Sequence, residues 1–258
     1  MRLGKRLQQI DRMVLTGYHH IWDCCCDHGL LGATLLQRNA AAHIHFVDVV
    51  PELMQALSTK LQKHAAAMNT NSRVDSAVQP AQWHTHCADA GTLPLQRYPG
   101  KHLLIIAGVG GELTAALVAQ ISAAHPELEL EFILCPVRQQ FLLRKQLIAL
   151  QCALIDEVLV SENRRYYELL HVLKPAALEK ANSKHPKECG QSEGVTTKGI
   201  PIHQVGSALW HAHSEEHAQQ LRRYLANTLR HYHAAKNQAA VAAYQNVKIQ
   251  WAKPSNRS

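Results

Sequence analysis

Short apolar runs alternate with longer amphipathic segments through the first 150 residues of the chain. The apolar runs have the length of β-strands and cover residues 19–24, 43–49, 82–87, 102–108 and 130–135. The segments with a helical spacing of apolar residues cover residues 3–14, 29–38, 51–67, 111–124 and 138–150. Because strands that alternate with helices are joined by crossovers, the pattern predicts a largely parallel sheet covered by helices on both faces.

The pattern changes after residue 150. Residues 153–175 contain two strand-like runs joined by the polar sequence SENRR, with no helical segment between them. Five strand–helix units that end in a β-hairpin follow the order of a class I methyltransferase, whereas a plain dinucleotide-binding fold places another helix there. The predicted fold is therefore α/β and Rossmann-like, with a mostly parallel seven-stranded sheet ending in a β-hairpin and a small C-terminal helical appendage.

The last third of the chain is predicted to form two further parts. Residues 176–203 are rich in Lys, Gly, Ser, Thr and Pro and lack periodicity, so a linker or partly ordered insert is predicted over 176–206. Residues 207–246 are predicted to be helical, and the final WAKPSNRS is expected to fray. The domains are accordingly predicted as 1–175, the linker, and a helical region over 207–258. An apolar stripe on the predicted helix comprises Leu209, Leu221, Leu225, Leu229 and Tyr232.

Charge and composition narrow the class of protein. The 258 residues carry a formal charge of +7, with 18 histidines as a cationic reserve. This charge favours a polyanionic partner such as RNA, with a merely solvated basic surface as the alternative. No apolar run approaches the roughly 18–20 residues that span a bilayer, and the N-terminus lacks the apolar core of a signal peptide. Seven scattered cysteines suit a reducing compartment, so we expect a cytoplasmic protein without membrane contact.

The sequence IWDCCCDHGLLG, residues 21–32, joins the first strand to the first following helix. In this fold class the turn usually reads D-x-G-x-G-x-G, and its glycines let the backbone approach the amino-acid end of S-adenosylmethionine. Asp23 takes the acidic position and Gly29 keeps one glycine, whereas Cys25 and Asp27 replace the other two. A metal site is disfavoured because adjacent side chains on an extended chain point to opposite faces and no C-x-x-C spacing occurs. The cysteines are interpreted as small, half-buried side chains.

Three later segments complete a predicted cofactor site. Asp48 ends the second strand, where a carboxylate suits the two ribose hydroxyls; a role at the start of the next helix is the alternative. Asp89 follows the third strand and suits the exocyclic amine of adenine, with a turn-forming role before Gly91 as the alternative. After the fourth strand, a close approach of cofactor or substrate is predicted at Ala107, Gly108 and Gly110.

Together these segments carry a resemblance to one family. DCCCDHGLLG resembles the D-I-G-S-D-H-A-Y-L-P signature of the bacterial tRNA (adenine(22)-N1)-methyltransferase (TrmK-like) family, matching at Asp23, Asp27, His28 and Leu31. IAGVGGEL resembles that family's I-A-G-M-G-G, and ENRRYYELL resembles E-x-x-x-Y-Y-E-I. LCPVRQQFLLRKQL resembles L-Q-P-N followed by L-R-x-W-L. The resemblance extends in order and spacing from residue 2 to about residue 173.

The resemblance implies transfer of a methyl group from S-adenosylmethionine to N1 of an adenine in tRNA, without a metal. It implies that Asp27 and His28 act near the methyl group, although Asp27 as a cap of the following helix is an alternative. Residues expected to contact the target base or tRNA phosphates are Pro136, Arg138, Tyr166, Tyr167, Arg222 and Arg223. Core packing of at least one tyrosine, and solvation of the two C-terminal arginines, are the alternatives.

Two departures from the family pattern leave the acceptor open. Cys25 stands where the family has glycine, and Val137 stands where it has asparagine. The alternatives are therefore a methyltransferase with another RNA or a small-molecule acceptor, and a non-catalytic RNA-binding protein that retains the fold.

Overall fold

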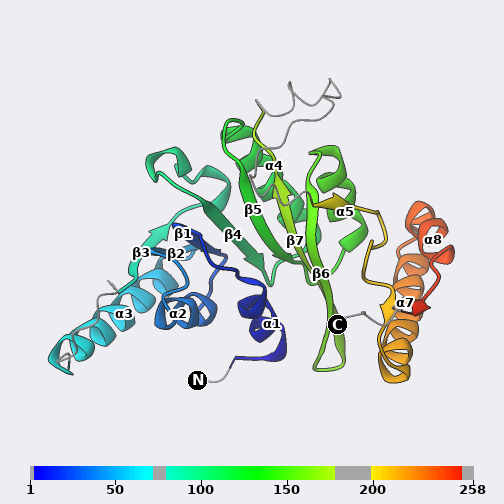
Figure 1. The fold of residues 1–258 in the computed structure, drawn as a ribbon, viewed down its shortest axis with the longest axis horizontal. Coiled ribbons are helices and arrows are strands. Elements are labelled where there is room, and N and C mark those ends of the chain that lie inside the picture. The colour runs from blue at the N-terminus through cyan, green and yellow to red at the C-terminus, as the bar shows by residue number, and fades with distance from the viewer. Residues whose placement is uncertain (1–2, 72–79, 178–198, 252–258) are drawn as a thin grey trace, which may run out of the picture.

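An eight-stranded sheet forms the centre of the molecule in the computed structural model, which describes residues 3–71, 80–177 and 199–251 (Figure 1). Its strand order is β3-β2-β1-β4-β5-β7-β6-β8. The parallel strands are β1 (His20–Cys24), β2 (His43–Asp48), β3 (Gln82–Cys87), β4 (His102–Ala107) and β5 (Leu130–Cys135). The antiparallel strands are β6 (Ala153–Glu162), β7 (Arg165–Lys174) and β8 (Ile200–Pro201).

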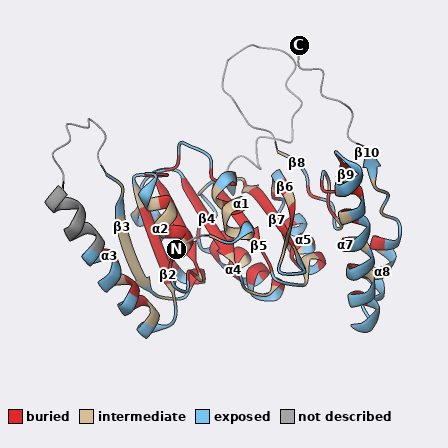
Figure 2. Cartoon of the chain, turned by 90° about the horizontal axis from the view of Figure 1, so that it is seen from below, coloured by how far each residue is buried: buried red, intermediate tan, exposed pale blue. Residues whose placement is uncertain are grey.

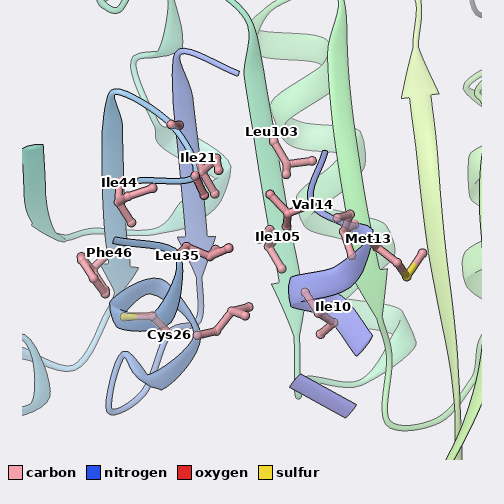
Figure 3. Close-up of a cluster of buried hydrophobic side chains, with 14 of the residues drawn as sticks. Ile10, Met13, Val14, Ile21, Cys26, Leu35, Ile44, Phe46, Leu103 and Ile105 are labelled. Atoms are coloured by element: carbon pink, nitrogen blue, oxygen red, sulfur yellow. The ribbon is translucent and has the colours of Figure 1, made fainter. Parts of the chain in front are cut away.

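Helices cover both faces of this sheet, as the alternating pattern predicts. One face is covered by α1 (Lys5–Met13), α2 (Leu30–Gln37) and α3 (Pro51–Asn71), whose apolar residues join one core cluster with the strands. Figure 3 shows Ile10 and Met13 of α1 in the cluster that also contains Leu103 and Ile105. The other face packs against α4 (Gly111–Ala124) and α5 (Gln140–Ala149). The central strands are consequently buried on both sides (Figure 2).

The β6–β7 hairpin extends past the sheet at the carboxyl ends of the parallel strands. Strand β5 pairs with β7 only from Leu130 opposite Lys174 to Leu134 opposite Leu170. Beyond that point β7 continues to Arg165 and pairs with β6 alone. The turn at Asn163 and Arg164 therefore projects from the same edge as the ends of β1, β4 and β5, next to α1 (Figure 1).

The predicted fold class is confirmed, with one additional strand. All five predicted parallel strands and the hairpin are present at the expected places. The sequence predicts a sheet of seven strands, but Ile200 and Pro201 add β8 to the sheet by pairing with Leu154 and Ala153 on the open edge of β6. A two-residue strand is too short to give an alternating pattern, so it was included in the predicted linker. Most of that linker, and the tail after Trp251, lie outside the described residues.

Residues 207–246, which the sequence predicts to be helical, form two helices preceded by a short strand. The chain forms β9 (His211–Ala212), α7 (Glu215–Ala234), α8 (Gln238–Gln245) and β10 (Gln250–Trp251), which pairs with β9. Helix α7 begins only after Ser214, whose side chain accepts a hydrogen bond from the His217 amide at 3.1 Å. Before α8, Lys236 has φ 55° and Asn237 caps the helix through the Ala240 amide at 3.0 Å. These local caps divide the segment.

The C-terminal helices pack on the sheet through a mixed apolar and ionic interface. Phe141 of α5 and Leu159 of β6 belong to the same apolar cluster as Leu221, Tyr224 and Tyr232 of α7. Within the predicted stripe, Leu225 and Leu229 are partly buried, whereas Leu209 is buried but precedes the helix. The division of the chain into a domain over 1–175 and a helical region over 207–258 stays a prediction.

A buried arginine lies at the centre of this interface. Arg144 of α5 has no exposed surface; its Nε donates to Glu168 Oε2 at 2.8 Å and its Nη2 donates to Glu157 Oε2 at 2.6 Å. Glu157 Oε1 also accepts hydrogen bonds from the amides of Ser207 and Leu209, at 2.5 and 2.8 Å. Tyr224 of α7 donates its hydroxyl to Glu168. The two carboxylates thus connect α5, the hairpin and the C-terminal helices.

Six histidines share one face of the sheet with Trp22 and Tyr98. They occupy strands β1 to β4 and comprise His20, His43, His45, His84, His86 and His102. His45 is fully buried, stacks on Trp22 with ring centroids 3.7 Å apart, and shares hydrogen bonds with His20 at 3.1 Å and His86 at 3.0 Å. Trp22 Nε1 donates to His102 Nδ1 at 3.1 Å.

Burial disfavours the protonated form of five histidines in this cluster. Burial, reinforced by neighbouring histidines, lowers the pKa of His45 to about 2 and that of His102 to about 4. Burial also lowers the pKa values of His20, His84 and His86. The cluster surrounds part of a cavity of about 250 Å³ near the amino ends of the strands, on the side opposite the first loop.

None of the helices in the described part of the chain is long and apolar enough to cross a membrane.

Candidate functional site

The loop after β1 is fixed by Asp23, the last acidic residue of that strand. Asp23 is buried, and its Oδ2 accepts a hydrogen bond from the Gly32 amide in the first turn of α2 at 2.9 Å. Burial raises the pKa of Asp23 to about 7; the Gly32 hydrogen bond opposes this effect, and the Asp48 carboxylate adds to it. Asp23 therefore positions the start of α2 against the sheet and titrates near neutral pH.

Cys25 lies between the acidic residues of three strand ends. Burial and the carboxylates of Asp48, Asp23 and Asp89 together raise the pKa of its thiol to about 11, so the thiol is neutral at pH 7. Its φ of 57° lies in the left-handed region, a backbone conformation that favours glycine. Cys24 and Cys26 are buried. All three cysteines occupy the small-residue places that the sequence suggests.

Asp27 and His28 form the exposed outer part of the loop. Their side chains are 69% and 72% exposed, and His28 Nε2 lies 3.7 Å from Asp27 Oδ1. Asp27 does not cap α2, because the cap residue is Gly29, with φ 65° and no side-chain hydrogen bond. A side chain at Gly29 would also meet Leu57 at 2.8 Å. The alternative role of Asp27 as a helix cap is thus wrong, and its carboxylate is free to face a ligand.

Asp48 and Asp89 hold the neighbouring loops. Asp48 Oδ2 accepts a hydrogen bond from the Asp27 amide at 3.1 Å, and Oδ1 accepts one from the Val50 amide at 3.2 Å. Asp89 Oδ1 accepts a hydrogen bond from the Gly91 amide at 2.8 Å, which is the turn-forming role considered above. Each carboxylate oxygen has two lone pairs, so these bonds leave acceptor capacity for a ligand.

The loops after β4 and β5 are joined through their backbones. Gly108 N donates to Cys135 O at 3.2 Å, Val137 N to Val109 O at 2.9 Å, and Gly111 N to Arg138 O at 2.9 Å. A Cβ atom at Gly111 would lie 2.7 Å from Arg138 O, whereas Gly110 has no such obstacle. Gly108 has φ 90° and is exposed. Ala107, Gly108 and Gly110, which were predicted to approach the cofactor or substrate, therefore lie in two loops that hydrogen bonds hold together at the carboxyl ends of the strands.

Arg6 also lies at this edge, and sequence reasoning missed it. Its guanidinium carbon is 5.1 Å from the centroid of the Tyr167 ring, and its terminal nitrogens lie 3.8 Å from the site of a Cβ atom at Gly108. Its Nε is buried without a hydrogen-bond partner among the described residues. Nothing in the local pattern marks Arg6, since it occupies one of several polar positions on the first helix.

The predicted substrate residues do not all come together. Arg138 is exposed beside Gly110, and Pro136 is buried behind it. Tyr167 is buried under Arg6, whereas Tyr166 points to the other face and contacts Tyr224 with centroids 5.6 Å apart. The tyrosines cannot stack on one base together, in agreement with the core-packing alternative. Both C-terminal arginines are exposed on α7, where Arg222 pairs with Glu215 at 2.9 Å.

In the described parts of the chain, no group of three or more His, Cys, Asp or Glu side chains could hold a metal ion. Among the described cysteines, Cys24, Cys25, Cys26, Cys87 and Cys135 are free thiols.

Comparison with known proteins places these features in a family. No curated protein matches the sequence. The structure of M. capricolum TrmK with S-adenosyl-homocysteine has a TM-score of 0.62 at 15% identity, over 95% of this chain and 94% of that one.

Two further solved structures are similar. The B. subtilis M1A22 tRNA methyltransferase TrmK has a TM-score of 0.54 at 17% identity, over 95% of both chains. A Streptococcus pneumoniae protein in complex with S-adenosyl-L-methionine has a TM-score of 0.58 at 17% identity, over 95% of this chain and 98% of that one. At these identities the structures show a shared fold. A family model described as "Methyltransferase domain" matches residues 3–170, and the chain therefore belongs to that methyltransferase family.

Proposed function

We propose that this protein transfers a methyl group from S-adenosylmethionine to N1 of an adenine in tRNA, in the cytoplasm. The observation that carries the proposal is the gathering of Asp23, Asp48 and Asp89 around Cys25 at adjacent strand ends. The similar structures named TrmK and M1A22 tRNA methyltransferase support the choice of acceptor. The sequence match at Asp27, His28 and the glycine loop supports it independently.

The residues at the strand ends suit the cofactor. Asp48 offers its remaining lone pairs to the ribose hydroxyls, and Asp89 offers Oδ2 to the adenine amine. Gly108 and Gly110 carry no side chain, so a ligand can approach their backbone on the adjoining loop. The Cys25 thiol is neutral and half-buried, so it adds a small side chain but no charge. Arg6, with its unpartnered Nε, supplies a cation on the same edge.

The chemistry requires orientation and charge stabilisation from the protein. S-adenosylmethionine, when bound, supplies an electrophilic methyl group on a sulfonium sulfur. Adenine N1 attacks through its own lone pair, so the protein needs no covalent intermediate. The exposed carboxylate of Asp27 can offset the positive charge that develops on the base, and His28 beside it can accept the N6 proton.

Methylation of bulk tRNA with methyl-labelled cofactor tests the acceptor. After digestion to nucleosides, we expect the label in 1-methyladenosine. Label in another nucleoside would contradict the N1 assignment but would still show that the protein is a methyltransferase. Calorimetry with S-adenosylmethionine tests the remaining alternative, because a protein that binds tRNA but no cofactor would be a non-catalytic RNA-binding protein.

Asp48→Ala is expected to weaken binding of S-adenosylmethionine by about 1–3 kcal/mol, since it removes charged hydrogen bonds to both loop and ligand. Isothermal titration calorimetry measures the change. Glu52→Ala is the matched control, because Glu52 is an exposed carboxylate in the first turn of α3. Equal affinities of the two variants would show that Asp48 does not contact the cofactor.

A further inference from the structure

The tip of the β6–β7 hairpin is an exposed cationic surface at the edge that carries the candidate site. Asn163, Arg164 and Arg165 are exposed, and the hairpin reaches beyond the end of β5. The first helix packs against this hairpin, which brings Arg6 to the same side. Figure 1 shows the turn and α1 next to each other at the lower edge.

Arginine at position 164 is unfavourable for the turn itself. Asn163 and Arg164 have φ values of 50° and 62°, as in a type I′ turn, which favours asparagine followed by glycine. A side chain in the left-handed region costs free energy that glycine avoids. A residue kept in an unfavourable backbone conformation at a ligand-facing edge points to a role for its side chain.

The cations at the tip are available to an outside partner. Neither Arg164 nor Arg165 forms an ion pair with any described residue. Glu162, the nearby carboxylate of the hairpin, already accepts a hydrogen bond from the Arg6 amide at 3.3 Å. Arg165 and Tyr167 lie two residues apart on β7 and so point to the same face, where the Arg6 guanidinium covers the Tyr167 ring.

We propose that Arg164 and Arg165 bind the phosphates of the RNA strand that flanks the target nucleotide. This proposal rests on the proposed function, which supplies an RNA acceptor. Adenine N1 lies on the Watson–Crick edge, so the base must leave its pair before it can react. Cations beside the site hold the flanking backbone while the base is displaced, and phosphate contacts of this kind fix register without reading sequence.

Binding of bulk tRNA to the full-length protein, measured against salt concentration without cofactor, tests the proposal. Arg164→Gly is expected to weaken tRNA binding roughly 3- to 10-fold and to reduce the slope of log K against log [salt] by about 0.9. Its thermal midpoint should equal or exceed that of the wild type, because glycine suits the turn. Arg165→Ala is expected to give a similar loss of binding, which provides a second variant independent of the turn conformation.

Lys236→Gly is the matched control. Lys236 is also an exposed cation with a positive φ, 55°, but it lies in the turn between α7 and α8. The Lys236→Gly variant should bind tRNA with the affinity of the wild type. Wild-type affinity and salt slope in both hairpin variants would overturn the proposal. A loss of tRNA affinity that is seen only in Arg223→Ala, on α7, would overturn it as well. A wild type that binds tRNA through the hairpin but methylates none would refute the proposed function alone. A wild type that binds no tRNA would refute both.

Discussion

Arg144→Met is expected to lower the free energy of unfolding by about 3–5 kcal/mol. The substitution fills a similar volume but removes the cation that Glu157 and Glu168 share in the interior. Both carboxylates would then be buried without a counter-charge, which is far more costly than loss of the pair as a whole. Urea denaturation followed by circular dichroism measures the change.

Two further variants separate this effect from simple loss of an arginine. Lys145→Met places the same side chain at the next position of α5, where the lysine is exposed, and should change stability by less than about 1 kcal/mol. Adding Glu157→Gln and Glu168→Gln to Arg144→Met should restore part of the lost stability, because neutral amides are cheaper to bury than carboxylates. A triple variant no more stable than Arg144→Met would contradict the charge explanation.

The histidine cluster should make the fold lose stability as the pH falls below about 6.5, the ordinary histidine value. The folded state holds these imidazoles neutral, with pKa values lowered to about 2 for His45 and about 4 for His102. The unfolded chain therefore binds more protons than the folded one in this range. Each such histidine then removes about 1.4 kcal/mol of stability per pH unit, until the pH reaches its own lowered pKa.

His45→Gln is expected to reduce this pH slope by about 1.4 kcal/mol per unit between pH 6.5 and 4.5, because glutamine does not titrate. Denaturation at several pH values measures the slope. Asp23 acts in the opposite direction, since its raised pKa favours protonation in the folded state, but it is common to both proteins and cancels in the difference. His233→Gln, at an exposed position, should keep the wild-type slope. Equal slopes for wild type and His45→Gln would contradict the assignment.

The sequence predicted the sheet well because its strands are short apolar runs at regular distances. Strand β5 and helix α4 begin and end at the predicted residues. The carboxylates of Asp23, Asp48 and Asp89 were predicted at the correct edge of the sheet, because the carboxyl ends of its parallel strands meet there. Their backbone partners could not be predicted, because those bonds depend on how each loop folds back on its neighbour.

Long-range partners account for most of what sequence analysis missed. Arg6 is adjacent to Tyr167 only after α1 packs on the hairpin, and Arg144 meets its two glutamates only across three elements. The alternation of His43 and His45 in β2 predicts one side of a strand, but not that four neighbouring strands join the same stack. The C-terminal segment was predicted to be helical from residue 207 because its apolar spacing includes Leu209, which lies before the cap at Ser214.

The chain that follows residue 199 is held to the sheet by noncovalent bonds. Ser207 and Leu209, which precede the C-terminal helices, bond to Glu157, and Tyr224 of α7 bonds to Glu168. These bonds lie wholly within the described residues on the two sides of the segment 178–198. A protein whose chain is cut between residues 177 and 199 should therefore assemble from two separate polypeptides.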